Sequence, residues 1–301
     1  MPEGHTTHAL AIRLSQAFAG SPVAVSSPQG RFAGGAALLD GLTLVDASAW
    51  GKHLFAEFEG ERWLNVHLGL IGKFSVLPRL TPAGGLTRPE DGEVPVVGQV
   101  RLRLLNAAWV GDLRGPTVCA VVGVEKVGQI QARLGPDPLR PDPASLAADL
   151  ALRRISRSAR PIAELLMDQT VLAGVGNVYR CEVLFRRRVD PFRPGREIRP
   201  ATWRAIWDDL VVLMPLGVAF GQVLTMDDQV ADALEEVAEG SASAQTAALT
   251  GAFSADGDHF ERRFFVYRRT GKPCRVCGSR VRTRLVAGRN LFWCGRCQRR
   301  R

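Results

Sequence analysis

Two Cys-X-X-Cys pairs near the end of the chain are the feature that most constrains its fold. Cys274 and Cys277 form the first pair, Cys294 and Cys297 form the second, and sixteen residues separate the pairs. Each pair places two thiolates on one metal ion from a tight turn, and two such turns complete a tetrahedral site. A site with four protein ligands has no open position for chemistry. The spacing therefore predicts one structural zinc ion, in a small domain that we expect to span residues 259–301.

Positive charge is concentrated around the same cysteines. Residues 261–301 contain 14 Lys or Arg and one acid, so this stretch alone exceeds the formal net charge of +9 that the whole chain carries. A structural zinc site does not need this charge, whereas a phosphate backbone attracts it. This end of the chain is therefore predicted to bind nucleic acid.

Length and composition set the wider organisation. A chain of 301 residues suggests two domains and a small third. The first residues are polar and no apolar run approaches about 18 residues, so we expect neither a secretory signal nor a membrane span. Cys119 and Cys181 lie singly in apolar stretches, away from the two cysteine pairs. A cytoplasmic protein without disulfides is the expectation.

The N-terminus begins almost directly with a helix. Leu10, Leu14 and Phe18 share one helical face, which predicts a helix from residue 4 onward. Removal of Met1 ahead of a small residue leaves Pro2 with a free secondary amine. A chain-terminal amine has a pKa of about 8, against about 10.4 for lysine, so far more of it is neutral and nucleophilic at pH 7. A secondary amine also forms a cationic iminium, which withdraws electrons from the adjacent carbon.

The first half of the chain has the pattern of a β-sheet domain. Residues 22–130 alternate polar and apolar positions in short runs that Gly, Pro or Asp separates. This pattern predicts an antiparallel sandwich or barrel within an N-terminal domain of residues 1–140. Residues 133–143 contain four prolines and are interpreted as an interdomain linker.

Helical patterns dominate residues 141–258, which we assign to a second domain. A turn that contains Gly174 and Gly176 precedes a helix that Asn177 is expected to cap. Amide groups exposed before a helix N-terminus favour phosphate, so this turn is a candidate phosphate cradle. Residues 227–258 are rich in Ala, Ser, Gly and acids, which predicts a mobile or partly helical insertion with no core to bury.

Seven short motifs follow one another along nearly the whole chain: Met1-Pro2-Glu3-Gly4, Gly51-Lys52-His53-Leu54, His67-Leu68-Gly69, Asp112-Leu113-Arg114-Gly115, residues 134–139, residues 167–179 and Gly288-Arg289-Asn290. Together with the cysteine pairs they resemble the Fpg/Nei family of formamidopyrimidine-DNA glycosylases and endonuclease VIII, and the Nei side in particular. The resemblance implies an α+β multidomain fold: an N-terminal helix plus an eight-stranded antiparallel β-sandwich, a helix-two-turn-helix (H2TH) domain and a C-terminal zinc-finger β-hairpin. It also implies a bifunctional DNA glycosylase/AP lyase of base excision repair that binds damaged DNA.

The resemblance implies roles for individual residues as well. Pro2 attacks the sugar C1′ of a flipped damaged nucleotide as a Schiff-base nucleophile, and Glu3 helps to open the sugar ring. Lys52 donates a proton to the leaving group, and Arg289 grips phosphate and serves the δ step of a β,δ-elimination. Leu70 occupies the position of a loop methionine that fills the gap left by the flipped base. DNA contacts are further implied at His67, Arg114, Gly174, Gly176 and Asn177.

Departures from the family pattern bear on the substrate. Thr6 stands where many relatives carry a second acid, and Leu70 replaces the loop methionine of Fpg proteins. The paired arginines and phenylalanine of those proteins are replaced around Arg114 to Pro116. These changes favour oxidised pyrimidines, with an 8-oxoguanine/formamidopyrimidine-type purine glycosylase as the alternative.

Functions of other classes fit the sequence less well. A noncatalytic zinc-ribbon protein that binds nucleic acid needs neither Pro2 nor Glu3 paired with Lys52. A metal-dependent nuclease needs clustered Asp, Glu and His, and the five histidines are scattered. A Ser/His/Asp hydrolase needs a nucleophile elbow, which the sequence lacks. We expect a monomer with zinc as its cofactor, with no small-molecule cofactor or membrane partner, associated with the nucleoid of a bacterial cytoplasm.

Overall fold

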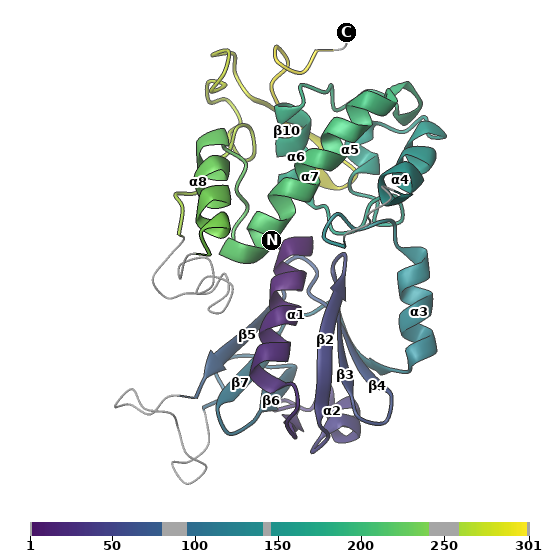
Figure 1. Ribbon diagram of the computed structural model, residues 1–301, viewed down its shortest axis with the longest axis vertical. Coiled ribbons are helices and arrows are strands. Elements are labelled where there is room, and N and C mark those ends of the chain that lie inside the picture. Colours follow the sequence, from purple (N-terminus) through teal and green to yellow (C-terminus); the bar gives the residue numbers. More distant parts are fainter. Residues whose placement is uncertain (1, 80–94, 141–145, 241–258, 300–301) are drawn as a thin grey trace. The chain divides into compact units, whose positions relative to one another are not determined.

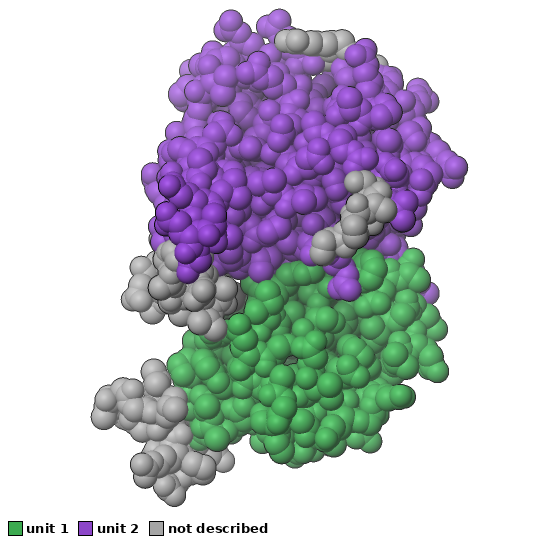
Figure 2. All heavy atoms as spheres, viewed as in Figure 1, with its two compact units in different colours: residues 1–2, 7–132 green, residues 3–6, 133–301 purple. Residues whose placement is uncertain are grey.

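The computed structural model describes residues 2–79, 95–140, 146–240 and 259–299, and the chain divides into two compact units (Figure 1; Figure 2). The first unit comprises residues 1–2 and 7–132, and the second comprises residues 3–6 and 133–301. The start of the chain therefore contributes to both units, with Pro2 in the first and Glu3 in the second. The domain boundaries expected at residues 140 and 258 stay predictions.

The first unit is a β-sandwich of two four-stranded antiparallel sheets. In spatial order, one sheet contains β1 (Ala24–Ser26), β6 (Leu102–Leu105), β7 (Trp109–Arg114) and β5 (Lys73–Pro78). The other contains β2 (Leu44–Trp50), β3 (His53–Phe58), β4 (Arg62–His67) and β8 (Val118–Val122). The short helices α2 (Ala33–Leu39) and α3 (Val124–Arg133) accompany the two sheets. The expected antiparallel sandwich is confirmed.

Helix α1 (Gly4–Phe18) begins at the residue that its sequence predicts. Leu10, Leu14 and Phe18 are buried in the core of the sandwich, as their common face requires. Asn106 fixes the C-terminal end of the helix, because its side-chain amide donates to the carbonyl oxygen of Ala17 at 2.8 Å. Most of α1 is thus part of the first unit, whereas its first turn belongs to the second.

The second unit is built from helices and a small hairpin. The described helices are α4 (Leu146–Ser156), α5 (Ile162–Leu165), α6 (Asn177–Arg186), α7 (Pro200–Phe220) and α8 (Asp227–Ala238), and a 3₁₀ turn, η2, spans Gly195–Glu197. Their core surrounds Trp203, Tyr179 and Leu213, which are almost completely buried. The hairpin pairs β9 (Arg282–Val286) with β10 (Arg289–Trp293). Ala287 and Gly288 connect these strands with φ angles of 49° and 72°, as a two-residue hairpin turn requires.

The proline-rich segment after residue 133 is packed, and its interpretation as a linker was wrong over the described residues. Gly135, Pro136 and Asp137 are buried. The N–H of Gly135 donates to the carbonyl oxygen of Gln169 at 2.7 Å, and the carbonyl oxygen of Pro136 accepts from Ala173 at 2.9 Å. The prolines therefore hold an extended segment against the turn that precedes α6. Residues 141–143 of the expected linker lie outside the described residues.

The expected insertion of residues 227–258 begins with helix α8, which does contribute to the core. Val230 and Ala233 are buried, and the side-chain amide of Gln229 donates to the carbonyl oxygen of Glu261 at 2.7 Å. The partly helical form was expected, whereas the absence of a core was wrong for these residues. Residues 241–258 lie outside the described part of the chain. Among the helices of the described residues, none is long and apolar enough to cross a membrane.

Candidate DNA-processing site

The carboxylate of Glu3 is the acceptor for the N-terminal amides of helix α6. Its Oε1 accepts from the N–H of Val178 at 2.7 Å, and its Oε2 accepts from Gly176 at 3.0 Å and from Tyr179 at 3.4 Å. Glu3 is fully buried. The first amides of a helix lack partners within it, so a carboxylate at this point satisfies hydrogen bonds and also stabilises the helix dipole. Glu3 therefore occupies the place of an N-cap side chain.

Glycines make this close approach possible. The N–H of Gly4 donates to the carbonyl oxygen of Gly174 at 2.8 Å, and a Cβ on Gly4 would lie 2.8 Å from the Cα of Gly174. Gly174 has a φ of +87°, which other residues rarely adopt. A Cβ on Gly176 would lie 2.3 Å from the carboxyl carbon of Glu3. These three positions require glycine because the N-terminal segment lies directly against the turn before α6.

This geometry corrects the expected phosphate cradle at Gly174 and Gly176. The amide of Gly176 is used by Glu3, and the amide of Gly174 donates to Oε1 of Gln169 at 3.0 Å. A single N–H donates one good hydrogen bond, so neither amide is open to a phosphate in this structure. The sequence correctly identified an anion-binding turn, but the bound anion is a side chain of the same chain.

Asn177 links helix α6 to the hairpin that carries Arg289. It is the first residue of α6, and the N-cap position belongs to Gly176, so the expected capping role of Asn177 was wrong. The side-chain amide of Asn177 donates to the carbonyl oxygen of Asn290 at 2.9 Å, and its Oδ1 accepts from the guanidinium of Arg180. Arg289 is half-buried at the first position of β10, directly after the hairpin turn. Asn177 and the residue after Arg289 are therefore in direct contact.

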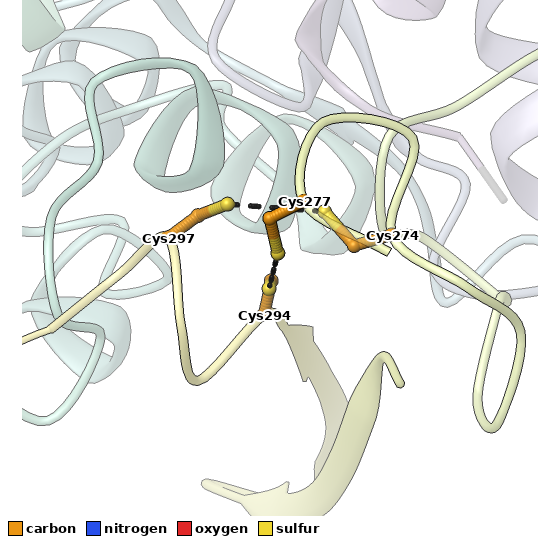
Figure 3. Close-up of side chains that lie close together, drawn as sticks. All are labelled: Cys274, Cys277, Cys294 and Cys297. Carbon is orange, nitrogen blue, oxygen red and sulfur yellow. Dashed lines mark hydrogen bonds between the residues drawn. The ribbon is translucent and has the colours of Figure 1, made fainter. Parts of the chain in front are cut away.

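The four cysteines of the two pairs come together as their spacing predicts (Figure 3). All four Sγ atoms lie within 4.8 Å of one another, with Cys274 and Cys297 at 3.9 Å and Cys277 and Cys294 at 3.4 Å. Four thiolates on two turns fit a tetrahedral zinc ion. The chain therefore has one structural zinc site.

Buried polar contacts attach this zinc finger to helix α6. The carboxylate of Glu182 is fully buried and accepts from the N–H groups of Phe265, Val266 and Tyr267 at 2.8 to 2.9 Å. Burial raises the pKa of Glu182, and these three donors act in the opposite direction. The segment that leads into the zinc finger is thus fixed to the middle of α6, while Asn177 holds the hairpin at its start.

In the first unit, Lys52 and His67 lie at the same end of neighbouring strands. Lys52 directly precedes β3, and His53 pairs with His67 across β3 and β4. The ring centroids of the two histidines are 4.9 Å apart. Burial, with the positive charges of His53 and Lys52, lowers the pKa of His67 to about 4, so its ring is neutral at pH 7. Nδ1 of His67 accepts from the N–H of Gly69 at 3.1 Å, which places the proton on Nε2.

The loop after His67 exposes two apolar side chains. Leu70 is 48% exposed and Ile71 is 87% exposed. Gly69, with a φ of +69°, fixes the turn, since a Cβ there would collide with the hydroxyl of Thr117. Ile71 was missed by the sequence reasoning, although it is the second apolar residue between two glycines. Exposed apolar residues on a rigid turn are available for insertion into another apolar layer.

Arg114 is engaged within the protein. Its guanidinium forms an ion pair with Asp112 at 2.8 Å and donates to the carbonyl oxygen of Val97 at 2.9 Å. Arg103 binds the same carboxylate of Asp112 at 2.8 Å. Gly115, which follows Arg114, lies about 4 Å from Ile71, measured from a Cβ placed on the glycine. The structure therefore places Arg114 beside the exposed loop, with much of its hydrogen-bonding capacity already used.

Each unit thus gathers its own group of expected residues. The second unit brings together Glu3, Gly174, Gly176, Asn177 and the hairpin of Arg289. The first unit brings Lys52 and His67 to one end of a sheet, next to the loop of Leu70. Pro2 directly precedes Glu3 in the chain.

Family models match three parts of the chain. The N-terminal domain of formamidopyrimidine-DNA glycosylase matches residues 1–117, and the H2TH domain of the same enzyme matches residues 134–228. A zinc finger found in FPG and IleRS matches residues 271–300.

Relatives and solved structures resemble the chain over most of its length. Endonuclease 8 1 of Mycobacterium tuberculosis is 48% identical over 301 residues, covering 99% of this chain and all of the relative. Formamidopyrimidine-DNA glycosylase of Thermus thermophilus is 32% identical, covering 87% of this chain and 85% of the relative. The crystal structure of MutM (Fpg) from Thermus thermophilus gives a TM-score of 0.68 at 28% identity, covering 99% and 98% of the two chains. A Lactococcus lactis Fpg complex with DNA that contains N7-benzyl-Fapy-dG shares the fold, with a TM-score of 0.74 at 20% identity and coverage of 99% and 100%.

Replacement of one zinc ligand tests the structural role of the metal. We expect Cys297→Ser to lose zinc and DNA binding together, because the metal supplies most of the folding energy of such a finger. Hydrogen exchange should show unchanged protection in β3 and β4 of the sandwich. Cys119→Ser, which alters a half-buried thiol in the other unit, is the matched control and should keep its zinc. A zinc-free Cys297→Ser protein that binds DNA fully would contradict this expectation.

Proposed function

The chain belongs to the Fpg and Nei family of DNA glycosylases and AP lyases, and from this premise we propose that it removes oxidised pyrimidines from DNA and cleaves the strand by β,δ-elimination. One observation carries the proposal: the residue that follows Pro2 is a buried carboxylate held by three amides of helix α6. That arrangement fixes the start of the chain at a defined point. A terminal amine is useful as a nucleophile when it is held in this way.

The proposed reaction starts with the neutral amine of Pro2. Its nitrogen bonds to C1′ of the flipped nucleotide while the bond from C1′ to the base breaks. The electron pair leaves with the base, which takes a proton from the ammonium of Lys52. The new nitrogen centre then loses its proton, the bond from C1′ to O4′ breaks, and O4′ is protonated. An iminium between Pro2 and C1′ results.

Glu3 is proposed to transfer that proton. Three N–H donors favour the carboxylate form of Glu3, whereas its full burial favours the neutral form, and we propose the carboxylate as the form that acts on the nitrogen of Pro2. Glu3 therefore takes the proton released at the nitrogen of Pro2 and passes it to O4′ as the sugar ring opens. Its negative charge, restored by this transfer, then stabilises the adjacent iminium cation.

Strand cleavage follows from the iminium. The cation withdraws electrons from C2′, so a C2′ proton is lost to the amine of Lys52, which the first step left neutral, and the 3′ phosphate is expelled. A second elimination, with loss of a C4′ proton to solvent water, expels the 5′ phosphate. We propose that Arg289 holds a phosphate during the second step, because a guanidinium binds phosphate with two parallel hydrogen bonds.

DNA contacts are proposed in both units. The side chain of Asn177 is buried and donates to the carbonyl oxygen of Asn290. This hydrogen bond fixes the hairpin of Arg289, and we propose that Asn177 contributes to phosphate binding in this way. The Nε2–H of neutral His67 is proposed to donate to a phosphate. We propose Leu70 and Ile71 as the side chains that replace the flipped base in the duplex, and Arg114 as a contact beside them. Gly174 and Gly176 are proposed to act indirectly, because they allow the N-terminal segment to lie against the turn before α6.

The preference for pyrimidines rests on Thr6, Leu70 and residues 114–116, where the sequence departs from Fpg proteins. A monomer without a small-molecule cofactor, acting on the bacterial nucleoid, completes the proposal. A panel of single- and double-stranded oligonucleotides with thymine glycol, 5-hydroxyuracil or 8-oxoguanine tests it. We expect faster single-turnover excision of the two pyrimidine lesions. Faster excision of 8-oxoguanine would favour the purine alternative.

Reductive trapping tests the nucleophile. Borohydride reduces an iminium, so we expect a covalent adduct with lesion-containing DNA that maps to Pro2. Pro2→Gly should lower the trapping rate by at least about tenfold, because it replaces the secondary amine with a primary one. An adduct that maps to Lys52, or full-rate trapping by the Pro2→Gly protein, would show that the nucleophile is wrongly assigned.

Salt titrations test Arg289. Loss of one phosphate contact should lower the slope of log K against log salt by roughly one unit in Arg289→Ala. Arg289→Lys keeps the charge but cannot form two parallel hydrogen bonds to one phosphate, so its affinity for DNA should lie between those of the wild type and Arg289→Ala. We expect excision of an intact lesion to suffer more than cleavage of a preformed abasic site, since an abasic nucleotide is easier to flip. Arg284→Ala, an exposed arginine on β9, is the control for general charge and should affect both substrates equally. If Arg289→Ala lost the same factor in rate on the intact lesion and on the abasic site, the assignment of Arg289 to a phosphate would be contradicted.

Truncation of the exposed loop tests the insertion of its side chains. Ile71→Ala should slow excision of an intact base by about tenfold while it leaves cleavage of an abasic site nearly unchanged, because the side chain would occupy the space of the flipped base. Leu77→Ala removes a side chain that is 47% exposed on β5 and is the matched control. A loss of the same size in both variants would assign the effect to general stability.

A further inference from the structure

His5 and Tyr179 pack against each other beneath the N-terminal segment. The side chain of Tyr179 is fully buried, and His5 is 4% exposed. Their rings meet edge to face, with centroids 5.5 Å apart and an interplanar angle of 82°. The hydroxyl of Tyr179 donates to the carbonyl oxygen of Leu213 in α7 at 3.4 Å. The histidine ring is thus enclosed between its own backbone and two helices of the second unit.

Gly217 of helix α7 provides the space that these two rings fill. A Cβ at this position would lie 2.3 Å from the hydroxyl oxygen of Tyr179 and 3.0 Å from both Cβ and Cγ of His5. Atoms do not approach this closely, so a side chain at residue 217 must displace one of the neighbours. Glycine costs about 1 kcal/mol relative to alanine inside a helix, which makes its presence in α7 notable.

Both neighbours are connected to Glu3 through the backbone. The ring of Tyr179 has no exposed surface into which it can swing, and its own N–H is one of the donors to Glu3. The Cβ of His5 is bonded directly to the backbone, two residues after Glu3. We therefore expect a displacement at residue 217 to reach the carboxylate of Glu3, its donors, or both.

We propose that Gly217, Tyr179 and His5 form an N-terminal seat, which positions Pro2 for attack from within the helical unit. This inference rests on the proposed role of Pro2 as nucleophile. The three residues are positioning residues that act through the backbone of residues 3–6, which belongs to this unit. Helix α7 then determines the position of the amine, although α7 begins 198 positions after Pro2 in the chain.

The test compares Gly217→Ala, Tyr179→Phe and the double variant in the full-length zinc-bound protein. We expect Gly217→Ala to lower single-turnover excision and borohydride trapping by at least about tenfold, since a shift of about 1 Å in a reacting group costs up to about 100-fold. The Kd for a duplex with a tetrahydrofuran abasic analogue should stay within about twofold. Tyr179→Phe removes the atom in the closest contact, so the double variant should be faster than Gly217→Ala alone.

Gly128→Ala is the matched control. Gly128 lies in helix α3, and a Cβ there meets no atom within 4 Å, so this variant should keep the wild-type rate. His5→Ala supplies a second test that introduces no clash: it removes the ring from the seat and should slow excision without weakening binding of the analogue. If Gly217→Ala fails to fold, by thermal unfolding and zinc content, His5→Ala decides the matter.

Several results would overturn the proposal. These are a wild-type rate in folded Gly217→Ala, no gain of rate in the double variant, equal losses of rate and of affinity for the analogue, or a wild-type rate in His5→Ala. Each of these is distinguishable from failure of the proposed function, because Pro2→Gly tests the nucleophile directly. A trapping-deficient Pro2→Gly protein combined with a fully active Gly217→Ala protein would reject the seat and keep the nucleophile.

Discussion

The capping of helix α6 by Glu3 is the interaction on which the arrangement of the second unit depends. A helix usually obtains its N-cap from the residue next to it, and substitution of such a cap costs about 1 kcal/mol. Gly176 has no side chain to offer, so the acceptor comes from a residue 173 positions earlier in the chain. Hydrogen bonds to a charged acceptor contribute about 1.5 to 3 kcal/mol each, which exceeds an ordinary cap. The same contacts that stabilise the helix thus hold the start of the chain in place.

Helix α6 is the common attachment for the other parts of the site. Its first residue holds the hairpin through Asn290, and Cys181 in its middle accepts from the N–H of Phe292 at 3.4 Å. Glu182 binds the segment that leads into the zinc finger. The zinc ion shapes the finger itself, whereas these contacts with α6 determine where the finger lies in the unit. A metal site with no catalytic role can therefore influence how Arg289 is presented.

The sequence predicted those features that a short pattern determines. Two cysteine pairs are sufficient for the zinc site, and a repeated apolar face is sufficient for α1. Strands β5 and β7 were not identified individually from the sequence; β5 ends in Pro78, and β7 contains Gly111 and Asp112, which are untypical of strands. Asp112 is buried there as the partner of Arg103, which no local pattern reveals.

The larger errors concerned contacts between distant segments. The prolines near residue 136 are typical of a linker. The sequence did not show that the backbone of this segment binds the turn at Gln169. The glycines before α6 indicated a turn that binds an anion, and the sequence could not show that the anion is the carboxylate of Glu3. Ile71 is an ordinary apolar residue in the sequence, and only the fold shows that its side chain is exposed. Local chemistry was thus predictable, while the pairing of these distant segments was not.

The long interval between Glu3 and its partners has a consequence during protein synthesis. The donors at Gly176 and Val178 emerge from the ribosome some 175 residues after Glu3, which takes about 10 to 35 s at about 5 to 20 residues per second. The sequence of the first unit is complete before then, since that unit ends at residue 132. Until α6 is translated, however, the carboxylate of Glu3 has no helix to bind. A truncated product that ends before α6 therefore lacks the contacts that fix the N-terminal segment in the complete protein.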